Sequence, residues 1–399
     1  MGFRITTNMM MNSYRYNLQG ATKKLSDSRD MVLTQRKFNS YAEDPAAATQ
    51  EFRLRRSYYD TYSQLNNTKN VYSKYNTAWN NLGGIVEKLS DATARMSSIQ
   101  GNNGGTGEAR KALAIVLRET SESVIHAMNQ KLGDQFIFAG NDGLNVPFEW
   151  KGEELYYRGI NVNAGGVEKP AGAEPNWGTP NEYGVPENMP PVGQDETEQE
   201  WIDYYNDQAD AAKLKEMANE QLYIDMGMGL SEKTANNAVN GSYFNSALCG
   251  VDFVGYGTDG NGDPKNLALV MRELADVFQA WDEDMDPQGY NPALAGTTAQ
   301  GLSSKELEEK AFRLMDKLKG AQEHITEKWD ELDAQSVFLT TNQERLETQM
   351  IDTNAQILDV SQVDLAEAIT NFSWQQYCYN AALKIGNQLL SQSLIDYMG

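Results

Sequence analysis

Few side chains of the kinds that carry out catalysis or bind metals occur in this chain of 399 residues. Its two histidines, His126 and His324, lie in helical patterns and outside the H-E-x-x-H arrangement of many metalloproteases. Its two cysteines, Cys249 and Cys378, are far apart and fit neither a zinc-binding spacing nor a disulfide framework. The sequence also lacks a Walker motif and a G-x-G-x-x-G segment after a strand. We therefore predict that the protein is not an enzyme and holds no cofactor or metal.

Two acidic segments, TDGNGDPKN (258–266) and DEDMDPQGY (282–290), space Asp or Asn at alternate positions, as calcium loops do. Neither has the Gly at loop position 6 or the Glu at position 12 that an EF-hand loop requires. We interpret Asp263 as the N-cap of a helix that Pro264 opens. The second segment is typical of a solvated helix end, and an adventitious calcium site is the alternative for both.

Composition and charge exclude several classes of partner. The net charge of −22 argues against nucleic acid, because phosphate binding needs clustered Lys and Arg. No run of about 18 apolar residues is present, so we predict no membrane insertion. The first twenty residues lack the apolar region of a secretory signal peptide. A row of aromatic residues from Tyr58 to Trp79 could bind a glycan, but its helical spacing favours helix packing.

Long helices with a seven-residue apolar repeat are predicted in both outer thirds of the chain. The segment FNSYAEDPAAA (38–48) interrupts the first, where Asp44 can cap a new helix with Pro45 at its first position. That second helix extends to about residue 99, and Gly83-Gly84 within it marks a bend or a close helix contact. The loop GNNGGTG (101–107) then leads into a third helix, antiparallel to the second. Near the other end, Ser303 and Glu306 form a capping box before nearly fifty residues of one helical phase.

The middle of the chain is rich in Gly, Pro, Asn, Asp and Tyr, and it shows short alternating runs rather than long periods. In GDQFIFAGNDGLNVPF (133–148) we predict a strand with Phe136 and Phe138 on one face and Ile137 on the other. Gly140 and Gly143 would permit the turns that follow. Residues 169–193 are predicted to be loop, and one helix is clear, with a buried stripe from Leu267 to Trp281.

The predicted fold class is α+β, with long terminal helices that form a coiled-coil or helical-bundle core and an inserted β-rich central domain. The predicted regions are an N-terminal helix region (1–44), a helical rod (45–140), a variable centre (141–302), a second rod (303–359) and a C-terminal helix (360–399). The two terminal stripes should pair and become ordered by packing against other subunits. The predicted assembly interface is Met11, Tyr14, Leu18, Leu25, Val32, Leu365, Ile369, Phe372, Tyr379, Leu383, Leu390 and Leu394.

Both ends of the chain resemble the flagellin superfamily. Within it, ITTNMM (5–10), FNSYAEDPAAA and GDQFIFAGNDGLNVPF resemble the hook-associated protein type 3 family, the hook–filament junction proteins of bacterial flagella. NQERLETQM (342–350) resembles a C-terminal helix motif of the superfamily, and the final SLIDYM (393–398) resembles the ending of the junction proteins. The resemblance covers about residues 1–160 and 310–399, and the centre beyond Gly159 departs from the pattern.

This resemblance implies a structural role in the flagellum. The chain would self-associate as a ring or helical layer, between a hook-side junction protein and the flagellin of the filament. It would be exported without a cleaved signal peptide by the flagellar type III pathway, with a cytoplasmic chaperone on its C-terminal region. The alternatives are a flagellin-like filament subunit, and a secreted adhesin or enzyme on such a scaffold.

Overall fold

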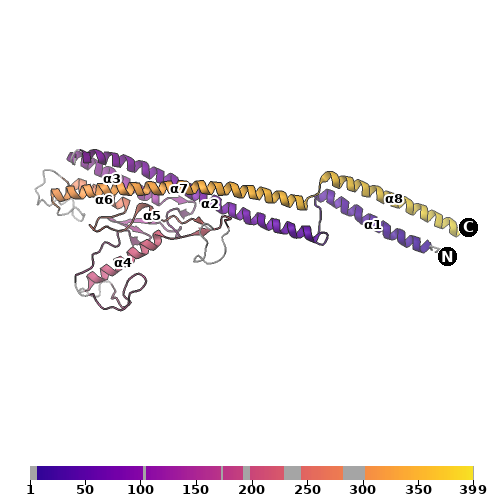
Figure 1. Ribbon diagram of the computed structural model, residues 1–399, viewed down its shortest axis with the longest axis horizontal. Helices are drawn as coiled ribbons and strands as arrows, with labels where there is room; N and C mark the ends of the chain where they lie inside the picture. The colour runs from indigo at the N-terminus through magenta and orange to yellow at the C-terminus, as the bar shows by residue number, and fades with distance from the viewer. Residues whose placement is uncertain are drawn as a thin grey trace. The chain divides into compact units, whose positions relative to one another are not determined.

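The computed structural model describes residues 7–101, 105–171, 174–191, 198–228, 244–281 and 302–398. Over these residues the fold is α+β and mostly helical, which confirms the predicted class (Figure 1). The chain forms two compact units. Residues 1–65 and 344–399 form the first unit, and residues 66–343 form the second. The long helices α2 (Pro45–Gly101) and α7 (Ser304–Ser361) run through both units. No described helix is long and apolar enough to cross a membrane.

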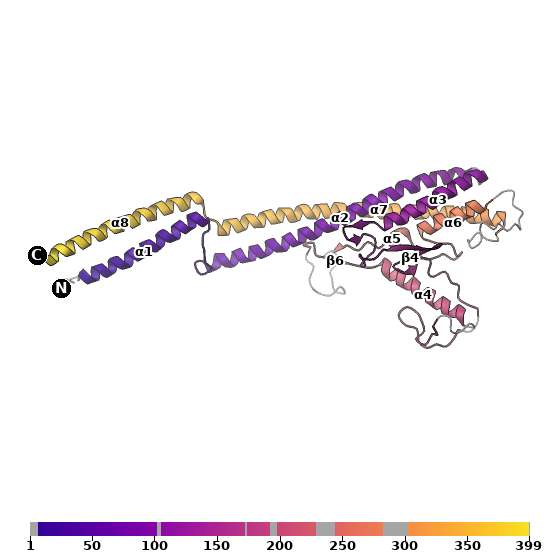
Figure 2. The ribbon, with the colours of Figure 1, turned by 180° about the vertical axis from the view of Figure 1, so that it is seen from behind.

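The first unit brings the two ends of the sequence together. Helix α1 (Thr7–Thr34) lies alongside α8 (Leu365–Met398), antiparallel to it, as both ribbon views show (Figures 1 and 2). Helix α2 begins at Pro45, where the Asp44 carboxylate accepts hydrogen bonds from the backbone N–H groups of Ala46 and Ala47 at 3.1 and 3.0 Å. The predicted cap at Asp44 is therefore confirmed, and it satisfies two N–H groups that a helix start leaves free.

Two short segments connect α1 to α2 and α7 to α8, and these two segments are hydrogen-bonded to each other. The backbone N–H of Lys37 donates to the Ser361 carbonyl at 2.9 Å, and that of Val363 donates to the Gln35 carbonyl at 3.1 Å. Arg36 and Gln362 form an antiparallel β-bridge between these bonds. Gln35 itself has a φ of 57°, a left-handed conformation that is uncommon for a residue other than glycine. The bridge ties the end of α1 to the start of α8.

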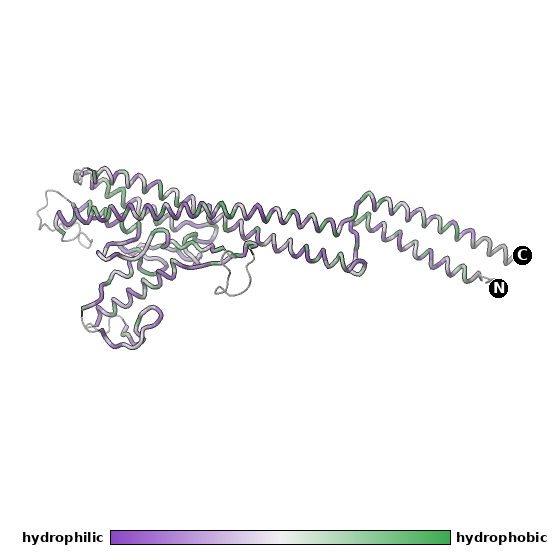
Figure 3. Tube along the Cα trace, in the orientation of Figure 1, coloured by the Kyte–Doolittle hydropathy of each residue, from purple (hydrophilic) through white to green (hydrophobic). Residues whose placement is uncertain are grey.

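In the second unit, buried apolar residues of α2 and α7 belong to one core and include positions seven residues apart. Figure 3 shows hydrophobic and hydrophilic residues alternating along both helices. The capping box that opens α7 is present, with the Ser303 hydroxyl and backbone N–H donating to the Glu306 carboxylate at 2.7 and 2.8 Å. The Trp329 indole N–H donates to the Trp79 carbonyl at 2.9 Å, and the two rings stack. A Cβ atom at Gly83 would contact Trp329, so the glycine marks a close helix contact. The seam residues are Leu82, Leu89, Met96, Ala311, Leu314, Leu318, Ile325, Leu332 and Leu339.

Helix α3 (Gly107–Met128) packs on α6 (Leu267–Ala280), whose predicted stripe is buried. One prediction about α6 is wrong. Its N-cap is Asn266, whose side chain accepts from the backbone N–H groups of Ala268 and Leu269. Asp263 lies three residues earlier, and its buried carboxylate instead binds Arg313 at 2.5 Å and Lys317 at 3.1 Å, both on α7. These partners distant in sequence hold the loop before α6 against α7.

Three small antiparallel sheets join the helices of the second unit. The strands β1 (Lys131–Leu132) and β2 (Gln135–Phe136) form a hairpin, and β6 (Tyr223–Ile224) pairs with β7 (Phe244–Asn245). The third sheet has the order β3-β4-β5, over Phe148–Lys151, Glu154–Tyr157 and Ile160–Asn161. These strands stay short because each ends at a turn, several of them at glycines with positive φ.

The segment 133–148 differs from its prediction. Its strand β2 ends at Phe136, whereas the predicted strand includes Phe138, and Phe136, Ile137 and Phe138 are all buried. The reason is that the backbone after β2 pairs with the segment before α5 (Gly250–Val254). The N–H of Gly140 donates to the Leu248 carbonyl, and the N–H of Gly250 donates to the Phe138 carbonyl. Gly140 has a positive φ as predicted for a turn, whereas Gly143 does not.

Helix α4 (Gln199–Ala218) was not predicted. It lies in the most acidic part of the sequence, yet Trp201, Ile202, Tyr205, Ala209 and Leu214 are buried. Trp201 and Tyr205 pack ring to ring, and Trp177 from the preceding loop contacts Tyr205. Residues 174–191 form that loop, as predicted, with a small turn around Asn181.

Candidate assembly interface

The contact between α1 and α8 is the structural counterpart of the predicted assembly interface. On α1 the predicted positions Met11, Tyr14, Leu18, Leu25 and Val32 are all half-buried. On α8, a Cβ atom at Gly386 would overlap the hydroxyl of Tyr14, so only glycine lets the two helices approach this closely. The residues of α8 that are fully or partly buried are Ala368, Phe372, Gln375, Cys378, Tyr379, Ala381, Ala382 and Gly386.

The phase of α8 in this seam differs from the predicted stripe. Phe372 and Tyr379 are half-buried, but Leu365, Ile369 and Leu383 are exposed. Gly386 lies directly against Tyr14 of α1, and Ala368 is also buried, whereas the two leucines and the isoleucine are more exposed. The side chains of Leu390 and Leu394 lie outside the described residues.

Apolar residues also occupy the sides of α8 that α1 leaves open. Trp374 and Tyr377 are 61% and 66% exposed, and their rings stack with centroids 5.8 Å apart. Ile385 is exposed on the same side. Only three of the 34 residues of α8 are charged. Large apolar side chains that gather on an exposed helix side with few charges are typical of a surface that a partner covers. Among the described residues, α1 covers one side only, so the remaining sides are available to a partner.

Charge is divided unequally between the two units. The first unit contains 12 Lys and Arg and 13 Asp and Glu, which gives a net charge of −1. The second unit therefore carries −21 of the total charge of −22. Copies of a chain with this distribution repel each other through the second unit, whereas the first unit can be brought close to others at little electrostatic cost.

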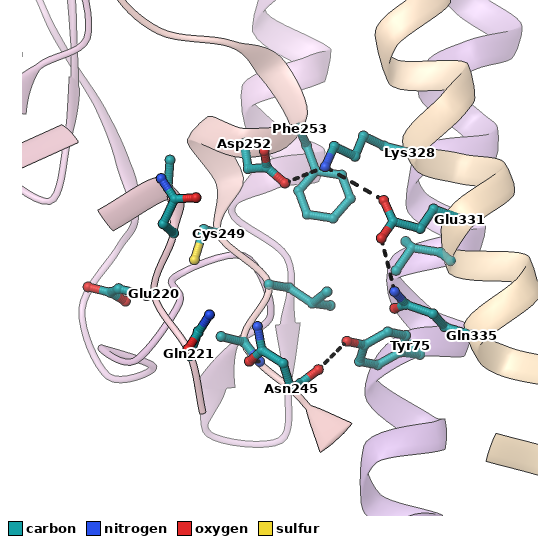
Figure 4. A pocket seen from close by; sticks show the side chains of 15 residues that line it. Tyr75, Glu220, Gln221, Asn245, Cys249, Asp252, Phe253, Lys328, Glu331 and Gln335 are labelled. Carbon is teal, nitrogen blue, oxygen red and sulfur yellow. Dashed lines mark hydrogen bonds and ion pairs between the residues drawn. The ribbon is translucent and has the colours of Figure 1, made fainter. Parts of the chain in front are cut away.

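A polar pocket in the second unit is the alternative candidate site (Figure 4). It has a volume of about 210 Å³ and lies between α7, α5 and the segments around Glu220 and Asn245. Lys328 from α7 binds the Asp252 carboxylate at 2.6 Å and the Glu331 carboxylate at 3.6 Å. The Tyr75 hydroxyl donates to the Asn245 carbonyl at 2.9 Å. The groups that face the pocket are thus largely engaged with one another.

The pKa values of Cys249 and Lys328 in this pocket do not favour a role of either side chain as a nucleophile. Burial raises the pKa of the Cys249 thiol to about 12, and nearby Glu220 and Asp252 act in the same direction, so the thiolate is scarce at neutral pH. Burial opposes the protonated form of Lys328, but its hydrogen bond and charge interaction with Asp252 prevail and raise its pKa. An ammonium held in this way is a poor nucleophile. The arrangement therefore resembles a structural ion-pair network more than a reaction site.

The two histidines line different cavities. His126 borders a cavity between the end of α3 and Trp150, whereas His324 lies on α7 with its Nε2 2.7 Å from the Asp252 carbonyl oxygen. No group of three or more His, Cys, Asp or Glu with metal-binding geometry occurs in the described parts of the chain. Cys249 and Cys378 are both free thiols.

The first calcium-like loop, residues 258–266, has cationic side chains where a metal would lie. Lys317 binds both Asp259 and Asp263, and Arg313 binds Asp263. Burial opposes ionisation of Asp259, but the hydrogen bonds from Lys317 and from the backbone N–H groups of residues 261 and 263 lower its pKa to about 2. The acidic side chains of this loop are neutralised by protein groups. The second loop, residues 282–290, lies outside the described residues.

Comparison with known proteins gives structural similarity but no sequence match. Neither a protein-family model nor a curated protein sequence matches the chain. Among solved structures, the chain is similar to that of a proposed flagellar hook-associated protein from Vibrio parahaemolyticus. The TM-score is 0.48 and the sequence identity is 10%, over 80% of this chain and 100% of that chain.

Proposed function

We propose that this chain is a structural subunit of the bacterial flagellum that joins hook to filament and is not an enzyme. It would assemble as a ring or helical layer through the pair of terminal helices α1 and α8. The observation that carries this proposal is α8 itself, which has few charges and exposes large apolar side chains, among them Trp374 and Tyr377, on sides that α1 does not cover. The resemblance of both chain ends to hook–filament junction proteins supplies the flagellar context.

The proposed mechanism is geometric. Terminal pairs from successive copies would pack into an inner layer, which matches a hook-side junction protein on one side and flagellin on the other. The near-neutral first unit supports close packing of many copies, and the acidic second unit would remain outside this layer in solvent. Before export by the flagellar type III pathway, a cytoplasmic chaperone would cover the apolar surface of α8.

A charge placed on α8 tests the proposal. In Leu383→Asp a carboxylate would enter the packing surface, where an unpaired charge is costly to bury. We expect assembly of the full chain, measured by sedimentation, to weaken by roughly 100-fold or more, together with loss of chaperone capture. Gln356→Glu adds the same charge at an exposed polar position of α7, outside α8, and should leave both unchanged. Equal behaviour of the two variants would contradict the proposal.

A deletion strain tests the flagellar role directly. Loss of the gene should leave hooks intact, abolish filaments and release flagellin monomers into the medium. Intact filaments in the deletion strain would contradict a junction role, and abundant incorporation of the chain along the filament would favour the filament-subunit alternative.

A further inference from the structure

The part of α2 and α7 that belongs to the first unit carries an apolar patch outside its own seam. The four residues of this patch are Phe52 and Tyr59 on α2 and Ile351 and Leu358 on α7, which are 65%, 63%, 66% and 40% exposed. Each pair is separated by seven residues, or two helical turns, so its members lie on one side of their helix. The Tyr59 ring also packs edge-on against the half-buried Tyr58, which limits its freedom.

The four residues lie on the same side of the helix pair. Each patch residue comes one position after a residue that is buried or half-buried between α2 and α7. Those preceding residues are Glu51, Tyr58, Met350 and Ile357. One residue is a rotation of about 100° in a helix. In an antiparallel pair, the same rotation away from the facing stripe brings both helices to the same side. Gln356 precedes Ile357 by one residue, so it lies on the opposite side.

The two edges of the patch also meet at the same level. The helices leave the first unit at Leu65 on α2 and at Glu344 on α7. Tyr59 is six residues before the first of these limits, and Ile351 is seven residues after the second. Phe52 and Leu358 each lie two helical turns further from these limits, so they are also at about the same level. The patch is therefore continuous, with an aromatic edge on α2 and an aliphatic edge on α7.

The charge around the patch indicates what covers it. Residues 45–65 contain three Arg against two acidic residues, whereas residues 344–361 contain one Arg against four acidic residues. The aromatic edge is thus on a basic segment and the aliphatic edge on an acidic one. When two copies lie side by side, the basic α2 edge of one copy can therefore face the acidic α7 edge of the next, and their charges are complementary. The low net charge of this unit also makes it the part where copies can approach most closely.

We propose that this patch is a lateral contact between copies of the chain, in which the aromatic α2 edge of one copy packs on the aliphatic α7 edge of the next. Such a head-to-tail contact leaves one edge free on each outer copy, so it continues around a ring or along a helical layer. The patch is smaller than the roughly 800 Å² per partner of a stable interface. It therefore acts together with the terminal-helix contact, and the inference rests on the proposed assembly.

Two variants of the full chain test the contact, one for each edge. Tyr59→Glu and Ile351→Glu should each raise the concentration needed for assembly at least tenfold, as is typical of a truncated interface hot spot of roughly 1.4 kcal/mol. Gln356→Glu, on the opposite side, adds the same charge and should assemble as the unmodified chain does. Circular dichroism should show equal helix content for all three.

Mixing the two edge variants gives the sharper result. Each keeps one intact edge, so an equimolar mixture should form dimers by sedimentation velocity and stop there. Assembly of either variant like the unmodified chain overturns the inference, as does a mixture that stays monomeric. If Leu383→Asp blocks assembly while both edge variants assemble normally, the lateral contact is wrong and the proposed function stands. An unmodified chain that remains monomeric would overturn both.

Discussion

The buried carboxylate of Asp263 provides the most quantitative prediction about the stability of the second unit. Its side chain is 2% exposed and is bound by Arg313 through two contacts at 2.5 and 3.1 Å, with Lys317 at 3.1 Å. Arg313→Met retains most of the aliphatic side chain and removes the guanidinium. Breaking a buried ion pair by removing one partner costs about 3–5 kcal/mol, whereas exposed pairs contribute about 1 kcal/mol or less. Because Arg313 is 39% exposed and Lys317 remains, we expect a loss of about 2 kcal/mol.

The assay is urea unfolding followed by tryptophan fluorescence, since six of the seven tryptophans lie in the second unit. Lys305→Met, on an exposed side of the same helix, is the control and should cost less than about 0.5 kcal/mol. Combining Arg313→Met with Asp263→Asn should recover most of the loss, with a coupling energy of about 1.5 kcal/mol. A coupling energy near zero, or a control that costs as much as Arg313→Met, would refute the reasoning.

The same cluster predicts a dependence on pH. The pKa of Asp259 is lowered from 3.8 to about 2, and that of Asp263 is also lowered. A carboxyl group whose pKa is lower in the folded state stabilises that state above its unfolded pKa, and the contribution is lost as pH falls. The stability conferred by the cluster should thus be complete above about pH 4 to 5 and decrease toward pH 2. The cost of Arg313→Met should shrink over the same interval.

Two further predictions concern glycine geometry and thiol reactivity. Gly140 and Gly133 both have positive φ, but only at Gly140 would a Cβ overlap the Glu220 carboxylate. Gly133→Ala should therefore lower the free energy of unfolding by about 1 kcal/mol, and Gly140→Ala by clearly more. Thermal unfolding measures both losses, and equal losses would contradict the close contact at Gly140. The Cys249 thiol is buried and its pKa is raised, whereas Cys378 is partly exposed. Iodoacetamide at pH 8 should therefore modify Cys378 first. Mass spectrometry that shows Cys249 modified first would contradict the burial of Cys249.

Sequence patterns were sufficient for the features that depend on near neighbours. The caps at Asp44 and Ser303 involve residues two or three positions away, so their residue types identify them. In α7 every seventh residue from Leu318 to Leu346 is a buried leucine or isoleucine, and the helix follows this plain seven-residue repeat. In each case the determining interaction lies within one or two helical turns.

Features that depend on distant partners were not predictable in the same way. Asp263 has the residue type and position of a helix cap, and only the approach of Arg313, fifty residues later, gives it another role. The predicted stripe of α8 contains Phe372 and Tyr379, which are half-buried, but it also contains Leu365, Ile369 and Leu383, which the close approach of α1 at Gly386 leaves exposed. In α4 the apolar positions do follow helical spacing, but the many acidic residues between them obscured it.

The pairing of α1 with α8 has a consequence for the order of folding. The loop between Thr34 and Leu365 is nearly the whole chain, and its closure entropy must be overcome before these helices meet. Growth of the α2–α7 seam toward Pro45 and Ser361 shortens that loop to the few residues on either side of the Arg36–Gln362 bridge. The pair therefore becomes favourable only after the long helices have joined. Non-local contacts of this kind form late in folding, so the apolar surface of α8 stays uncovered until the rest of the subunit is in place.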